Sequence, residues 1–134
     1  LGEWCNLVAD TNNSNLKNNY AEVRLWDYDK EGFSKTGLQF CGLIMGDHSK
    51  CAINTMFNTG TVIGVSANIF GSGFPRNFVP SFSWGGSAGM SVYKLDKVFE
   101  TAELVLKRRN LELTDADKNI LEHVFEETAK WRRF

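Results

Sequence analysis

The feature that most constrains this 134-residue chain is a repeat of six residues between Met45 and Phe74. Cut into sixes, the run reads MGDHSK, CAINTM, FNTGTV, IGVSAN and IFGSGF. The first position of every unit is apolar and the fifth is always small. Two further units, LGEWCN and LVADTN, open the chain.

A six-residue unit has room for one short strand and a turn. Because side chains alternate across a strand, the first and fifth positions point the same way, and we expect them to point inward. Asn and Gly suit the corners, where positive φ is needed. An antiparallel sheet rich in turns is the alternative, but hairpin signals normally recur every 8–12 residues. Stacked units that bury one continuous inner column, a solenoid, fit the spacing better.

The repeat is interrupted between about residues 13 and 37, where a charged segment alternates apolar and polar positions around a turn at 29–32. The sequence predicts a loop or hairpin inserted into the solenoid. Its aromatic side chains must be covered, since together they would form an exposed apolar patch. Either the solenoid wall or a neighbouring subunit can cover them, and both options stay open for Tyr20, Trp26, Tyr28 and Phe33.

Two kinds of structure are expected after Phe74. Pro75 and Pro80 should end the repeat, because proline cannot donate to an interior ladder, which leaves 75–90 as an extended exit segment along the outside. Apolar stripes at helical spacing then predict two helices within 91–134, the second opened by a capping box at Thr114 and Asp117. We expect 1–90 to form the solenoid and 91–134 a helical pair that caps or flanks its C-terminal end.

Charge is balanced overall but unevenly distributed. The formal net charge is −1, no charged residue occurs from Cys51 to Pro75, and nine basic and nine acidic residues lie in 94–134. This excludes a nucleic-acid binder that works by bulk positive charge, and no apolar run is long enough to cross a membrane. With three scattered cysteines and two histidines, we expect no metal site, reduced thiols and a cytoplasmic setting.

The repeat resembles the hexapeptide repeat of left-handed parallel β-helices, over residues 1–12 and roughly 38–74. The stretch TNNSNLKNN and the later pattern of Gly46, Asp47, Lys50, Ile53, Asn54 and Gly60 also resemble the C-terminal region of sugar-1-phosphate nucleotidyltransferases. These include bifunctional N-acetylglucosamine-1-phosphate uridyltransferase/glucosamine-1-phosphate acetyltransferases and glucose-1-phosphate thymidylyltransferase-like proteins. The resemblance implies a left-handed β-helix, a homotrimer, an upstream nucleotidyltransferase domain, and a sugar phosphate or nucleotide sugar as ligand.

The resemblance also implies which residues belong to a site. Acetylating relatives carry a histidine base where this chain has Asn18, and an amide cannot act as a base at neutral pH. His48, at a hexad corner, is therefore the candidate catalytic base, although a solvated turn residue is the simpler interpretation. The candidate substrate-binding residues are Asn15, Asn18, Lys50 and Asn54.

Two functions follow from these residues. The first is a trimerisation scaffold with a sugar-phosphate site in a nucleotidyltransferase-like transferase, which needs no cofactor of its own. The alternative is an acyltransferase that uses acetyl-CoA and an amino-sugar phosphate, with His48 as base. A pure interaction module is a third, weaker hypothesis.

Overall fold

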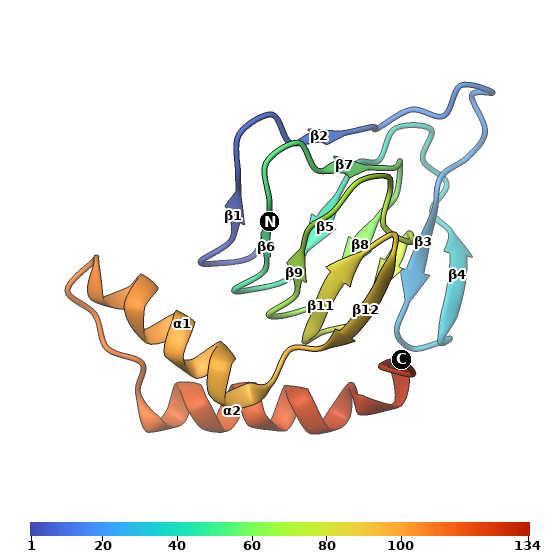
Figure 1. The fold of residues 1–134 in the computed structure, drawn as a ribbon. Coiled ribbons are helices and arrows are strands. Elements are labelled where there is room, and N and C mark those ends of the chain that lie inside the picture. The colour runs from blue at the N-terminus through green and yellow to red at the C-terminus, as the bar shows by residue number, and fades with distance from the viewer.

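Short strands lie at the boundaries between hexads in the computed structural model, which describes residues 1–134 (Figure 1). The strands are β1 (Asn6–Leu7), β2 (Asn12–Asn13), β3 (Arg24–Asp27), β4 (Gly32–Lys35), β5 (Ile44–Met45), β6 (Lys50–Cys51), β7 (Met56–Phe57), β8 (Val62–Ile63), β9 (Asn68–Ile69), β10 (Phe78–Val79), β11 (Ser83–Gly86) and β12 (Gly89–Val92). The helices are α1 (Leu95–Lys107), α2 (Asp115–Glu127) and a 3-10 helix at Ala129–Trp131.

Successive hexad strands belong to three different sheets, which we call walls. The first wall has the order β1-β6-β9-β11-β12, the second is β2-β7, and the third is β10-β8-β5. All their pairings are parallel except β11 with β12. Lys50 pairs with Asn68, eighteen residues on, so the chain returns to the same wall after three hexads. This arrangement of parallel sheets is compatible with the expected β-helix.

The hexad positions predicted to face inward form the core between the walls. Five first-position side chains and Val79 are at most 2% exposed, and all belong to one apolar cluster with Ala67: Met45, Cys51, Phe57, Ile63 and Ile69. Fifth-position Ser49, Thr55 and Thr61 are buried as well. Thr55 and Thr61 each donate a hydroxyl hydrogen bond to the carbonyl three residues earlier, which satisfies the buried hydroxyl. Only small side chains of this kind fit where the walls converge.

The inserted segment leaves the ladder after Ser14, whose N–H donates to the Phe57 carbonyl. It returns at Cys41, whose carbonyl accepts from Gly60 N–H. Between these points the predicted hairpin is present as β3 and β4, paired antiparallel. Trp26 stacks on Phe78 of the third wall with ring centroids 4.0 Å apart. Within one chain this stack covers Trp26, whereas Tyr28 and Phe33 remain 42% exposed and Tyr20 66% exposed.

The expectation that the repeat ends at Pro75 is wrong. Parallel pairing continues beyond it, since Phe78 pairs with Val62 and Trp84 with Asn68. The spacing shortens from eighteen to sixteen residues, and Pro75 and Pro80 lie outside the paired strands. Proline is tolerated at such positions because no ladder hydrogen bond is required there. The segment 75–90 thus adds strands to two walls instead of running along the outside.

The two helices flank one corner of the solenoid along several hexads and do not cap its end (Figure 1). Buried Val98, Ala102, Leu106 and Leu121 pack with Phe82, which is 0% exposed, and with Trp4 and Val65. The predicted capping box is present, with Thr114 and Asp117 bonded reciprocally. Ile120 of α2 lies outside this packing and is 62% exposed.

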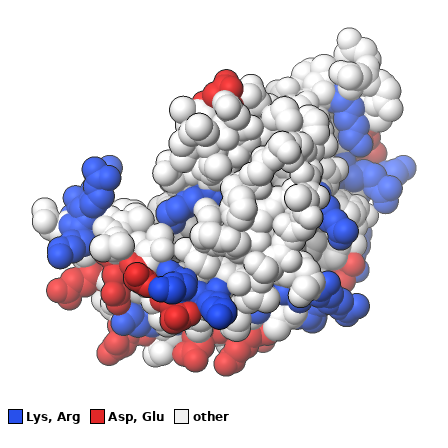
Figure 2. All heavy atoms as spheres, in the orientation of Figure 1, with Lys and Arg blue, Asp and Glu red and all other residues white.

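Figure 2 shows how the uneven charge is distributed over the fold. Charged side chains of both signs crowd the helices, whereas the body formed by the hexad walls is largely without charge in this view. The helices of the chain lack the length and the apolar composition that a membrane span requires.

Candidate functional site

His48 lies at the corner where the chain passes from the third wall to the first. Its φ is +62°, and three other residues with positive φ occupy the equivalent position of neighbouring turns: Trp4, Ser66 and Phe82. The corners are stacked by backbone hydrogen bonds, including His48 N–H to the Glu3 carbonyl and Ser66 N–H to the Asp47 carbonyl. We call this column the helix-side corner, since α1 and α2 pack against it.

The His48 imidazole is half-buried and lacks a hydrogen-bond partner at its buried Nδ1 atom. Burial lowers the pKa of His48 below its ordinary value of 6.5, and the positive charge of Lys50 lowers it further. The carboxylates of Asp47, Asp117 and Glu3 oppose this shift. The ring is therefore neutral at pH 7, which is the form that can accept a proton.

A cavity of about 230 Å³ lies between this corner and the helices. Glu3, Asp47 and His48 line it from the solenoid, while Asp117 and several apolar side chains line it from the helices. Two carboxylates have structural partners, because Asp47 Oδ1 accepts from Glu3 N–H at 2.8 Å and Asp117 closes the capping box. The volume falls below the range of about 300–1,000 Å³ typical of ligand sites, so this cavity admits only a small molecule.

Lys50 is the one predicted substrate-binding residue that contacts His48. Its Nζ donates to the His48 carbonyl oxygen at 2.9 Å, and its pKa is lowered by burial. Lys50 lies on β6 between Asn6 and Asn68 of the first wall. The structure therefore brings one cation and one imidazole together at the helix-side corner.

The remaining predicted residues lie elsewhere in the chain. Asn54 has φ +58° at the next corner, between β6 and β7, and Asn15 and Asn18 lie in the inserted segment just beyond β2. All three side chains are exposed. The separation from His48 is a consequence of the repeat, since a shift of six residues moves a position to the next wall. Within one chain these amides form no common site with His48.

Sequence reasoning missed the carboxylates around His48. Glu3 belongs to the first hexad and Asp117 to the second helix, so neither is near residue 48 in sequence. The hexad alignment contains a signal for Glu3, because LGEWCN places Trp4, the residue after Glu3, at the position of His48. No signal in the sequence places Asp117 there, because it depends on how the helices dock.

No set of three or more His, Cys, Asp or Glu side chains is grouped so that it could hold a metal ion. Comparison with known protein families finds no family that matches the chain, and comparison with curated proteins finds no significantly similar sequence.

Proposed function

We propose that residues 1–90 form a left-handed β-helix that serves as the trimerisation scaffold of a sugar-phosphate nucleotidyltransferase-like transferase. The observation that carries this proposal is the ladder spacing, in which Lys50 and Asn68 are neighbours on one wall eighteen residues apart. Three hexads per turn is the periodicity of the hexapeptide-repeat family that the sequence resembles. The sugar phosphate or nucleotide sugar, the cytoplasmic setting and the upstream catalytic domain belong to the same proposal and rest on that resemblance.

An exposed apolar patch supports an association of copies. Leu38 and Phe40 are 50% and 58% exposed, and they lie beside Tyr20, whose carbonyl accepts from the Gln39 side chain. Large apolar side chains clustered at the surface commonly mark an interface. The three come from the two arms of the inserted segment, so the segment offers a surface to a second copy of the chain.

Light scattering on the purified chain tests the scaffold. The expected mass is three times the 15.1 kDa of one chain. The double variant Leu38→Asp/Phe40→Asp should dissociate the assembly, whereas Leu104→Asp, which changes a leucine of α1 that is 63% exposed, should leave it intact. A wild-type chain that remains at the mass of one copy at tens of micromolar would contradict the proposal.

A second candidate function is acyl transfer from acetyl-CoA to an amino-sugar phosphate. The observation that favours it is the neutral, unpartnered His48 beside a cavity. An acetyl-transfer assay with glucosamine 1-phosphate discriminates the two, with His48→Asn as the control because Asn tolerates positive φ. The scaffold proposal expects no turnover by either protein. Turnover that His48→Asn abolishes would establish the acyltransferase instead.

A further inference from the structure

A second and larger cavity is lined by none of the predicted site residues. It encloses about 590 Å³, within the range of small-molecule sites. Its walls come from the approach to β10, the β11–β12 turn at Gly86–Gly89 and the C-terminal residues after α2. Its aromatic and charged lining consists of Phe74, Arg76, Phe78, Trp131, Arg133 and Phe134.

The charged side chains that line this cavity are both basic. Arg76 and Arg133 line it, and no Asp or Glu side chain does. Neither guanidinium takes part in an ion pair. Arg133 donates only through Nε, to the Lys130 carbonyl at 2.9 Å, which orients the group and leaves both terminal nitrogens free.

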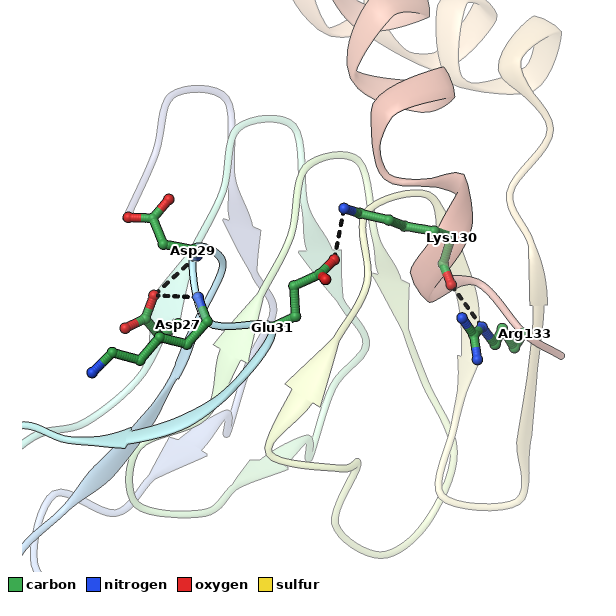
Figure 3. A network of polar contacts seen from close by, with 6 residues as sticks. Asp27, Asp29, Glu31, Lys130 and Arg133 are labelled. Atoms are coloured by element: carbon green, nitrogen blue, oxygen red, sulfur yellow. Dashed lines mark hydrogen bonds and ion pairs between the residues drawn. The ribbon is translucent and has the colours of Figure 1, made fainter.

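The neighbouring charges do not neutralise these arginines. Glu31, the nearest acid in Figure 3, is paired with Lys130 at 2.6 Å. Asp27 of the hairpin accepts hydrogen bonds from the backbone N–H groups of Asp29 and Lys30. The planar fork of an arginine matches the oxygens of a phosphate, so two free guanidinium groups in one cavity suit a phosphorylated ligand.

The aromatic lining divides into a fixed part and a free part. Phe78 and Trp131 are held in a cluster with Trp26, in which Phe78 stacks at 4.0 Å and Trp131 packs edge-on. Phe74 and Phe134 have no aromatic partner and are 48% and 50% exposed. Free rings beside basic side chains are the elements that bind a nucleobase together with its phosphate.

We propose that this cavity binds an organic phosphate carrying a planar ring, of the size of a nucleoside monophosphate. Arg76 and Arg133 hold the phosphate, and Phe74 or Phe134 stacks on the ring. The inference goes beyond the proposed function, because all its residues come from one chain and none belongs to the predicted substrate-binding set.

Isothermal titration with AMP and with UMP tests the proposal on the intact chain. At least one should bind, and its complex should weaken roughly tenfold or more in Arg76→Ala and in Arg133→Ala, as expected for loss of hydrogen bonds to a charged group. Arg76→Lys, which keeps the charge but loses the fork, should bind with intermediate affinity. Arg109→Ala changes an arginine outside the cavity and should bind like wild type. Circular dichroism checks that each variant is folded.

The nucleoside without phosphate and ribose 5-phosphate without the base separate the two halves of the site, and each should bind at least tenfold more weakly than the parent nucleotide. The proposal is overturned if neither nucleotide binds at millimolar concentration, if folded Arg76→Ala and Arg133→Ala bind like wild type, or if either partial ligand binds as tightly. Light scattering on the same samples keeps the two proposals distinct, because a single-copy mass with binding intact contradicts only the scaffold.

Discussion

Substitution of Gly64 by alanine is a sharp test of how the hexads stack. Gly2, Gly46 and Gly64 occupy the same position in successive turns at the helix-side corner. A Cβ added to Gly64 would lie 2.8 Å from Ser81 Cα, and one added to Gly46 would lie 2.9 Å from the Gly64 carbonyl carbon. Both distances are shorter than carbon–carbon contact, and the obstructing atoms are backbone, which cannot rotate away.

The magnitude follows from the cost of overpacking. Forcing an extra methyl group into a packed site costs about 1–3 kcal/mol. For a domain of this size we expect Gly64→Ala to lower the midpoint of thermal unfolding by roughly 3–10 °C. Urea denaturation followed by circular dichroism should show the corresponding loss of free energy of unfolding.

Gly32→Ala is the matched control, because its added Cβ would meet only the Lys30 carbonyl oxygen at 3.9 Å. We expect this variant to lie within about 0.5 kcal/mol of wild type. If Gly64→Ala is no less stable than Gly32→Ala, the backbones of successive turns are not in close contact at this corner.

Three further predictions concern contacts of single side chains. The pKa of His48 is lowered from 6.5, so the folded state favours the neutral imidazole. This contribution to stability is complete above pH 6.5 and is lost as the pH falls through the lowered pKa. His48→Asn should therefore flatten that part of a curve of stability against pH. Arg132 donates to the carbonyls of Phe125 and Ser81. Arg132→Ala should lower the free energy of unfolding in urea by about 1–3 kcal/mol, and an unchanged value would show that these hydrogen bonds do not stabilise the fold. Trp26→Ala removes the stack on Phe78 and should speed proteolysis within residues 14–41, whereas exposed Tyr20→Ala should not; equal cleavage rates would count against hairpin docking.

The hexad pattern predicts one short strand per unit and the inner column up to Phe74, but not the later wall strands β10 and β11. The reason is physical: a strand alternates its side chains, so an apolar first position and a small fifth position specify one buried face. Corner residues were only partly predictable. His48 and Asn54 have positive φ, as do Trp4 and Phe82; the hexad alignment places Trp4 at the corner, but Phe82 lies beyond the hexads and has no such signal. Both aromatic residues are explained by the helices that bury them.

Long-range docking was beyond the sequence pattern. Nothing local reveals that Trp26 stacks on Phe78 or that Asp117 lies near His48, because each pair joins elements far apart in the chain. The two prolines were misleading for a related reason. Proline forbids a ladder hydrogen bond at its own nitrogen, and at a corner between short strands no such bond is needed. The parallel pairing of Phe78 with Val62 is therefore compatible with Pro75 before the strand and Pro80 after it.

An experimental crystal structure of the chain is the most direct test of the central proposal, a left-handed β-helix that forms a trimer. It should show left-handed turns of three hexads, with Asn6, Lys50 and Asn68 in line on one wall, and three copies related by a threefold axis. Right-handed turns, or a chain without threefold contacts that also has the mass of one copy in solution, would contradict the proposal.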